Sequence, residues 1–168
     1  MVERGAKPRN NRTVHPTTVR VRLVSPPLDE AGRLHRFPYG EPCPGHNGLR
    51  GQDHGDWAGR TLDEVAGEDP GGLRRWMTDT AYAPAGGGES VEALIARVGA
   101  HLGALAPGTH RAVVGQGVVR AAVVWALELP AAAFWRLDVR PGSVTALTGR
   151  SGRWNLLVGG PEDPPDRG

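Results

Sequence analysis

Apolar and polar residues alternate over residues 19–24, and this pattern is typical of a short strand with one buried face. Residues 112–115 form a second apolar run, which predicts a buried strand. Near the end of the chain, strand-like patterns lie at 135–139, 143–147 and 153–158, separated by Pro-Gly and Ser-Gly turns. We expect the last two of these strands to pair as a hairpin.

Between these strands the apolar residues recur at steps of three and four, which predicts helices. The longest such stripe follows Ser90, a good N-cap residue. Thr61 and Glu64 have the spacing of a capping box, so another helix is expected to begin there and to end before Pro70. A third stripe covers residues 118–127. Shorter helical segments are expected at residues 29–36, 73–77 and 131–135.

The order of strand, helix, strand, helix and strand predicts an α/β sandwich with a mostly parallel sheet. The length of 168 residues and the hydrophobic content of 39% fit one domain, which we place at residues 19–160. Residues 1–18 are polar and show no periodicity, so we predict a flexible leader there. Residues 161–168 are predicted to form a disordered tail.

The composition narrows the range of partners and compartments. The formal net charge is only +2, and no basic face with interleaved aromatic residues is visible, so we expect no nucleic acid partner. No apolar run is long enough to cross a membrane, and we expect no membrane contact. Cys43 is the single cysteine, which excludes an internal disulfide and fits a reducing compartment. We therefore predict a cytoplasmic protein.

The turn Gly115-Gln116-Gly117 joins a predicted strand to a predicted helix. A polar side chain in such a turn lies at the carboxyl edge of a sheet, beside the free N–H groups of the helix. Corners of this kind bind anions and host catalytic residues. The two glycines also allow a tight connection without any function, and the sequence alone leaves both interpretations open.

Three segments of the chain together resemble the histidine phosphatase, or phosphoglycerate mutase-like, superfamily. They are HGDWAGRTLDEV, GGGESVEALIARV and VVGQGVVRAAVVWALELPAAAFWRLDVRPGSVTAL, and they span roughly the last two thirds of the chain. The resemblance implies a three-layer sandwich that is shortened by one strand and one helix, because only CPGHNG stands where the family inserts them. In this family two histidines, two arginines and a carboxylic acid carry out phosphoryl transfer.

The sequence departs from the family at the positions that carry this chemistry. The family's Arg-His-Gly after the first strand corresponds to Ser25-Pro26-Pro27, and its Ser-His-Gly at the second corner corresponds to the turn at Gln116. A proline nitrogen within the chain cannot attack phosphorus, and a neutral amide cannot carry the charge of an imidazolium. The resemblance therefore implies that conventional phosphomonoesterase chemistry is lost, and residual phosphatase activity is only a weak alternative.

Several polar residues nevertheless remain for a site at this corner. We predict Glu89, at the position of a family carboxylate, and Gln116 as catalytic residues. Glu89 is expected to be partly desolvated against Trp57 or Trp125, which would suit a general acid or base. Support of the following helix is an equally good interpretation of Glu89. The predicted substrate-binding residues are Ser25, Arg33, Arg36, Trp57 and Arg120.

His46, Asp53 and His54 are residue types that bind zinc, but their spacing matches no metal motif. We predict a solvated loop at these residues, and neither a metal nor a cofactor in the protein. The role of the three side chains stays open at this point.

Two functions of different classes follow. The first is an enzyme that converts a small anionic or carbonyl-containing metabolite by acid–base catalysis, as a lyase, isomerase or cyclase in a specialised biosynthetic pathway. The second is a noncatalytic pseudophosphatase that acts as a binding or scaffold protein. We also predict a homodimer, because a sheet that has lost a covering element exposes a surface that needs burial.

Overall fold

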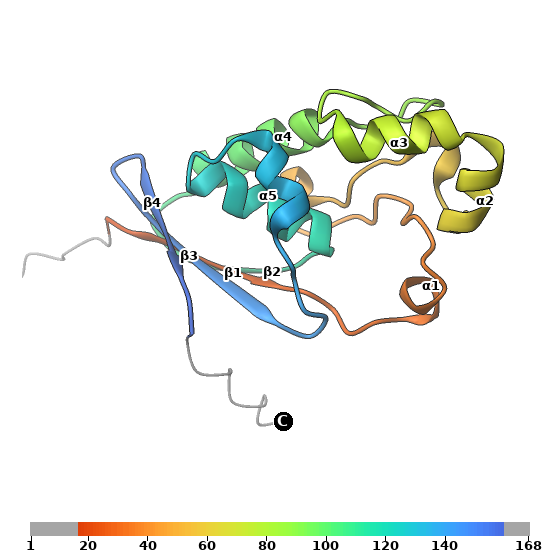
Figure 1. Ribbon diagram of the computed structural model, residues 1–168. Helices are drawn as coiled ribbons and strands as arrows, with labels where there is room; N and C mark the ends of the chain where they lie inside the picture. The colour runs from red at the N-terminus through yellow and green to blue at the C-terminus, as the bar shows by residue number, and fades with distance from the viewer. Residues whose placement is uncertain (1–16, 160–168) are drawn as a thin grey trace, which may run out of the picture.

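A four-stranded sheet is the central element of the computed structural model, which describes residues 17–159 (Figure 1). Its strands are β1 (Val19–Val24), β2 (Gly108–Val113), β3 (Val144–Arg150) and β4 (Arg153–Leu157). The order across the sheet is β2-β1-β3-β4, so the first strand of the chain lies inside the sheet. The predicted leader and tail lie outside the described residues, apart from residues 17 and 18, and the predicted domain limits stay a prediction.

The sheet is mixed, which corrects the prediction of a mostly parallel sheet. β1 and β2 are parallel, whereas β3 is antiparallel to both β1 and β4. The N–H of Ser25, just beyond β1, donates to the carbonyl of Ser143, just before β3, at 2.9 Å. Because β3 begins where β1 ends, it runs back along β1 in the opposite direction. The predicted α/β class and the predicted β3–β4 hairpin are confirmed.

The helices begin at the capping residues that the sequence indicated. Thr61 forms a complete capping box with Glu64, and the Ser90 hydroxyl accepts the N–H of Ala93. Pro70 both prevents the preceding helix from continuing and starts the next one. The α-helices are α1 (Glu30–Arg33), α2 (Leu62–Glu68), α3 (Pro70–Thr78), α4 (Val91–Gly103) and α5 (Gln116–Ala126). The 3-10 helices are η1 (Asn47–Leu49), η2 (Gly55–Trp57) and η3 (Ala131–Arg136).

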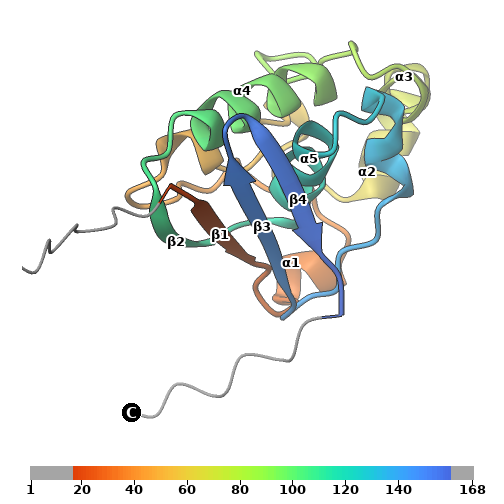
Figure 2. The same ribbon diagram turned by 90° about the vertical axis from the view of Figure 1, so that its left-hand side faces the viewer.

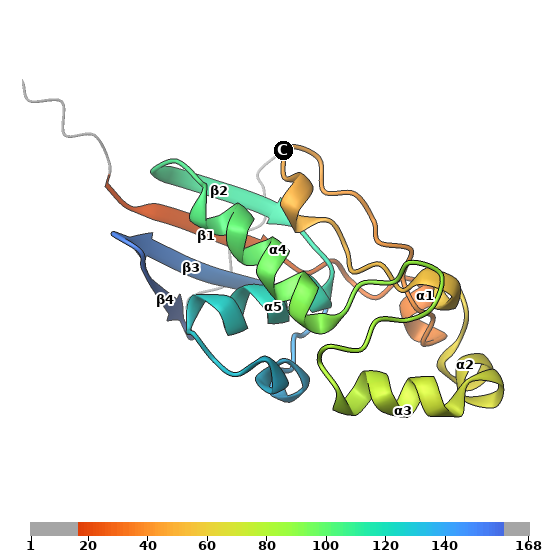
Figure 3. The same cartoon turned by 90° about the horizontal axis from the view of Figure 1, so that it is seen from above.

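Helices α4 and α5 lie over one face of the sheet, as the two side views show (Figure 1 and Figure 2). The view from above shows the same two helices crossing the strands (Figure 3). Within residues 17–159, no helix covers the opposite face of the sheet. The described part of the fold therefore has two layers rather than the expected three, because residues 43–48 form only a turn and the start of the short 3-10 helix η1 and add no further covering helix.

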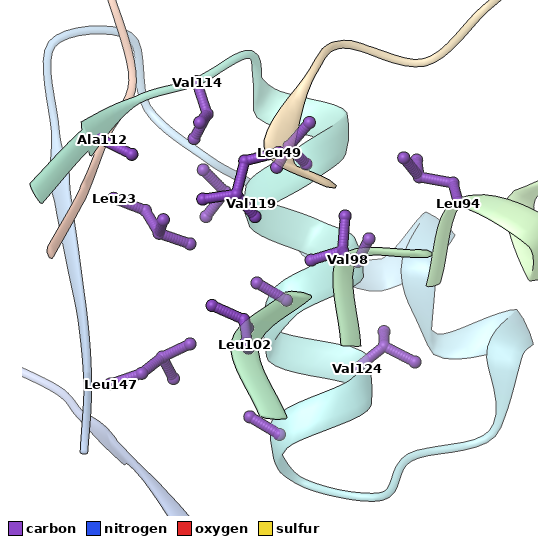
Figure 4. Close-up of a cluster of buried hydrophobic side chains, with 14 of the residues drawn as sticks. Leu23, Leu49, Leu94, Val98, Leu102, Ala112, Val114, Val119, Val124 and Leu147 are labelled. Atoms are coloured by element: carbon purple, nitrogen blue, oxygen red, sulfur yellow. The ribbon is translucent and has the colours of Figure 1, made fainter. Parts of the chain in front are cut away.

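The main core fills the space between the sheet and these two helices (Figure 4). Leu23 and Leu147 of the sheet point toward Leu102 of α4, and all three are at most 1% exposed. Full burial of a leucine contributes about 1.5–3 kcal/mol to stability. The two helices approach closely at Gly99, where a Cβ atom would lie 2.1 Å from Cδ1 of Trp125. Any larger residue at Gly99 would therefore push α4 and α5 apart.

The predicted strand at residues 135–139 is wrong, because residues 135 and 136 belong to η3 and residues 137–139 form no regular secondary structure. The ring of Trp135 packs edge-on against Trp76, with 4.5 Å between the ring centroids, and against Phe134 at 5.0 Å. These contacts between aromatic rings compensate for the missing strand pairing. The predicted short helical turn over residues 131–135 is present.

Candidate functional site

The turn singled out in the sequence forms a corner between the sheet and helix α5. The N–H of Val114 donates to the carbonyl of Val24 at 2.9 Å, so the ends of β2 and β1 lie side by side. Gly115 is the N-cap of α5, and no side chain in the described residues caps this helix. The first N–H groups of α5 can therefore bind a ligand. We refer to Ser25 and residues 115–117 as the α5 corner.

Ser25 contributes a buried hydroxyl group to this corner. Its side chain lies on the same face of the chain as Leu23, and the residue is 1% exposed. Its backbone groups pair with Gly142 and Ser143, but its Oγ has no hydrogen-bond partner among the described residues. A buried hydroxyl without a partner is costly, and such groups are rare in folded proteins. Ser25 was predicted as a substrate-binding residue, and that role stays a prediction.

Gln52 is a residue of this region that sequence reasoning missed. It is 5% exposed, and its Nε2 donates to the carbonyl of Glu89 at 3.0 Å. Its Oε1 lies 3.9 Å from the position that a Cβ atom would take at Gly117. Gln52 thus lies close to Gly117 of the α5 corner while it belongs to the loop before η2. The loop has no periodicity, and the position of Gln52 just before the HGDW segment was the only signal in the sequence.

Glu89 lies in a paired and mostly buried environment. Both carboxylate oxygens accept hydrogen bonds from Arg97, from Nε to Oε1 and from Nη2 to Oε2, each at 2.7 Å. The two side chains are 10% and 18% exposed. Arg97, rather than Trp57 or Trp125, therefore determines the surroundings of the carboxylate. A bidentate ion pair of this kind is among the strongest charge-assisted contacts in proteins.

Arg97 also binds the loop that leads to Gln52. Its guanidinium donates to the carbonyls of Gly48 at 2.9 Å, Arg50 at 3.1 Å and Gly51 at 3.3 Å. Every one of these contacts ties loop backbone to helix α4. We refer to Glu89, Arg97 and these three carbonyls as the Glu89–Arg97 cluster. Its geometry is that of a structural clamp, in which Glu89 binds the Arg97 side chain of α4, whereas the Ser90 hydroxyl caps the start of that helix.

Arg120 is engaged by the segment that contains and follows η3. Its Nε donates to the carbonyl of Leu137 at 2.7 Å, and its guanidinium lies over the ring of Phe134 at 5.7 Å. Burial lowers the pKa of Arg120 from its ordinary value, and the negative charge of Asp138 partly opposes this effect. Although Arg120 is one helical turn beyond Gln116, the structure uses it to hold the segment after η3.

The other predicted binding residues do not gather at the α5 corner either. Arg33 is exposed and donates to the carbonyl of Leu28 at 3.2 Å, while Arg36 donates to the carbonyl of Gly59 at 2.8 Å. Trp57 is 3% exposed and belongs to a second core cluster with Phe37. These side chains have structural partners, and of the predicted site residues only Ser25, just after β1, and Gln116, at the start of α5, follow the adjoining ends of β1 and β2.

His46, Asp53 and His54 lie in separate environments. His54 is 5% exposed and stacks near Phe37, with 5.2 Å between the ring centroids. Burial lowers the pKa of His54, although its hydrogen bond to the carbonyl of Pro38 acts in the opposite direction. The Oδ1 of Asp53 accepts the N–H of Gly55 at 2.9 Å, so this carboxylate shapes the loop.

His46 instead meets two histidines from other elements. Its Nδ1 lies 3.1 Å from Nε2 of His101, and its ring also faces that of His110. The pKa of His101 is lowered by burial first, and then by the charges of His46 and His110. Within residues 17–159, no group of three or more His, Cys, Asp or Glu side chains could hold a metal ion.

Several solved structures have a similar fold. A mycobacterial glucosyl-3-phosphoglycerate phosphatase in complex with VO3 has 23% identity and a TM-score of 0.67, and the match covers 83% of this chain and 97% of that one. A putative alpha-ribazole-5'-P phosphatase from Escherichia coli has 18% identity and a TM-score of 0.69 over 83% and 95% of the two chains. YhfR of Bacillus stearothermophilus has 16% identity and a TM-score of 0.71 over 84% and 96%. At these identities the likeness shows the fold alone.

No helix in the described part of the chain is both long and apolar enough to cross a lipid bilayer. The predicted cytoplasmic location stays a prediction.

The sequence comparisons identify the family. No curated protein matches the chain. The family model of the histidine phosphatase superfamily (branch 1) matches residues 33–159, which is most of the chain and begins beyond β1. The resemblance seen in the sequence is thus confirmed, and the chain belongs to the histidine phosphatase superfamily.

Proposed function

We propose that this protein binds a small ligand through an anionic or carbonyl oxygen at the α5 corner, without transferring a phosphoryl group. The observation that carries the proposal is the uncapped N-terminus of α5 beside the buried, unpaired hydroxyl of Ser25. Helix N–H groups attract negative oxygen atoms, and a hydroxyl can donate one further hydrogen bond. The corner therefore offers donors for a ligand oxygen.

Loss of phosphoryl transfer follows from the residues at the two positions that the family resemblance identifies. Pro26 follows β1 and Gln116 begins α5, and neither side chain can act as the nucleophile or as a charged imidazolium. The described histidines lie elsewhere: His54 contacts Phe37, and His46 contacts His101. The phosphatase names of the similar structures are therefore not carried over to this chain.

Binding is favoured over the acid–base conversion that the sequence also suggested. Such a conversion needs a side chain that can gain or lose a proton beside the ligand. Glu89 was the predicted acid or base, and both of its oxygens are engaged by Arg97. Gln116 does not titrate. The pseudophosphatase alternative, a noncatalytic binding protein, is therefore the one we propose.

Phosphate binding and phosphatase activity can be tested separately. Inorganic phosphate, which is bound in a similar mycobacterial structure, and 3-phosphoglycerate serve as probes, followed through backbone amide NMR shifts. We expect shifts at residues 115–117. Gln116→Glu, which adds a negative charge at the helix N-terminus, should weaken phosphate binding at least about tenfold, or about 1.4 kcal/mol. Asn47→Asp, the same chemical change at an exposed position, is the matched control and should change binding less than about twofold.

Hydrolysis of p-nitrophenyl phosphate and 3-phosphoglycerate is assayed with the same preparations, and we expect none above the uncatalysed rate. Turnover that disappears in Gln116→Glu but persists in Asn47→Asp would contradict the loss of phosphoryl transfer. Absence of amide shifts at residues 115–117 with either probe at millimolar concentration would overturn the binding proposal itself.

A further inference from the structure

The face of the sheet that no described helix covers has an unusual composition. Val21 and Leu23 point toward the helices and are buried, so the intervening Arg20 and Arg22 point to the opposite face. We refer to this opposite face of β1–β4 as the outer face. The strand register places Arg111 of the edge strand β2 beside Arg22 on this face. Arg150 and Arg153 face each other at one end of the β3–β4 hairpin.

The positive charge of the outer face is not balanced by the strands themselves. None of the four strands in the described residues contains an aspartate or a glutamate. The arginines at 20 and 111 are exposed. Guanidinium groups are positively charged. The strands therefore give this face a positive surface.

Apolar side chains form a row at the end of the outer face that lies opposite the Arg150–Arg153 pair. Val24 pairs with Val113 on one side and with Val144 on the other, so the three valines lie next to one another across the sheet. Val113 is 52% exposed and Val144 is 40% exposed. Leu157, on the outer side of β4, is 61% exposed. A row of exposed apolar residues beside charged ones is typical of an interaction surface.

We propose that the outer face docks a segment of another protein that carries both acidic and apolar side chains. Its carboxylates would pair with Arg20 and Arg111, and its apolar side chains would cover the row at Val113, Val144 and Leu157. This surface is distinct from the α5 corner, and the proposal does not depend on a ligand there.

The same composition disfavours other occupants. A second copy of this chain, packed face to face at about 10 Å, would bring two sets of arginines together without any strand carboxylate between them. Single-stranded nucleic acid is usually bound on a sheet through stacked aromatic rings, and the outward positions of β1–β3 hold none. The homodimer predicted from the sequence stays a prediction, and its face-to-face form becomes an outcome of the test.

The test uses the full chain and a short fluorescent peptide in which a run of glutamates is followed by a run of valines, with a peptide in which serines replace the valines as its charge control. The charge-reversal variant Arg20→Glu with Arg111→Glu should weaken binding of the glutamate–valine peptide at least about tenfold. The matched control reverses Arg74 and Arg136, which are exposed on α3 and η3, and should change binding less than about threefold. Unchanged thermal unfolding confirms that both variants fold.

A second variant isolates the apolar row. Val113→Ser with Leu157→Ser should weaken binding of the glutamate–valine peptide about threefold or more, and leave the glutamate–serine peptide nearly unchanged. If the two charge-reversal variants lost peptide affinity equally, net charge alone would explain the effect, and the proposal would be overturned.

Three further results would each assign the face to another occupant and overturn the proposal. The first is a dimer mass at micromolar concentration that Arg20→Glu with Arg111→Glu converts to a monomer. The second is tighter binding of a single-stranded oligonucleotide than of the glutamate–valine peptide. The third is a rise in peptide affinity when the acidic residues Glu162, Asp163 and Asp166 of this same chain are changed to their amides.

Discussion

The Glu89–Arg97 cluster and the α5 corner are neighbouring regions that differ in whether their polar groups have hydrogen-bond partners within the protein. In the cluster, a buried carboxylate and a guanidinium satisfy each other, and the remaining donors of Arg97 bind loop carbonyls. At the corner, the helix has no side-chain cap and the Ser25 hydroxyl has no partner in the described residues. Gln52 lies between them, bonded to the backbone of Glu89 and close to Gly117.

This difference separates residues that stabilise the fold from residues that can bind a ligand. A polar group whose hydrogen bonds are complete inside the protein has nothing left for a ligand, whatever its position in a family pattern. A buried polar group left without a partner reduces stability, and this cost is common at functional sites. Glu89 falls in the first class and Ser25 in the second.

The largest expected effect comes from breaking the cluster. Arg97→Met leaves the mostly buried Glu89 carboxylate without its partner and releases the carbonyls of residues 48, 50 and 51. We expect a loss of about 3–5 kcal/mol in the free energy of unfolding, measured by urea denaturation. The double variant Arg97→Met with Glu89→Leu should recover part of this loss, because no buried charge remains unpaired. A single variant as stable as the wild type would show that the cluster is not a structural clamp.

A smaller effect is expected from pH, and it arises at His54 of the loop before η2 and at His101 of α4. The pKa of His54 is lowered by burial, and that of His101 is lowered by burial and by the nearby histidines. Stability is therefore complete above the ordinary histidine pKa of about 6.5 and is lost as the pH falls through the lower folded values. Urea denaturation at about pH 7.5 and about pH 5 measures the loss. His54→Gln should reduce it, and an unchanged loss in that variant would exclude His54 as a source.

The smallest effects come from two serines that differ only in their partners. The Ser90 hydroxyl caps α4 beside the cluster, so Ser90→Ala should cost about 1 kcal/mol of unfolding free energy. The Ser25 hydroxyl has no partner among the described residues, so Ser25→Ala removes an unpaired buried polar group and should raise the free energy of unfolding by about 1 kcal/mol. Thermal unfolding of both variants under one set of conditions provides the comparison. A cost at Ser25 equal to that at Ser90 would mean that its hydroxyl is paired within the chain.

Local signals in the sequence predicted most of the elements. The capping residues Thr61 and Ser90 and the alternation over residues 19–24 are short-range patterns, and the structure has each element in place. The direction of β3 was not predictable in this way, because it depends on where the chain re-enters the sheet. The alternating residues 135–139 predicted a strand, and aromatic packing of Trp135 against Trp76 gave a 3-10 helix instead.

The site was predicted only in part, for a similar reason. Gly115 to Gly117 form a local motif, and the corner is where the motif predicted it. The pairing of Glu89 with Arg97 depends on how the start of α4 meets the loop at residues 48–51. Gln52 acquires its position only when that loop packs on the start of α5. Contacts between distant segments therefore decide which polar residues are free.

The position of β1 inside the sheet also has a consequence for synthesis of the chain. Its partners are residues 108–113 and 144–149, so β1 leaves the ribosome long before either neighbouring strand exists. Until then the apolar side chains of Val21 and Leu23 have no sheet to join, and such segments are prone to aggregate. Arg20 and Arg22 alternate with them and oppose pairing with other nascent chains through like charge. The arginines that mark the outer face of the finished protein thus also protect its first strand while the chain is incomplete.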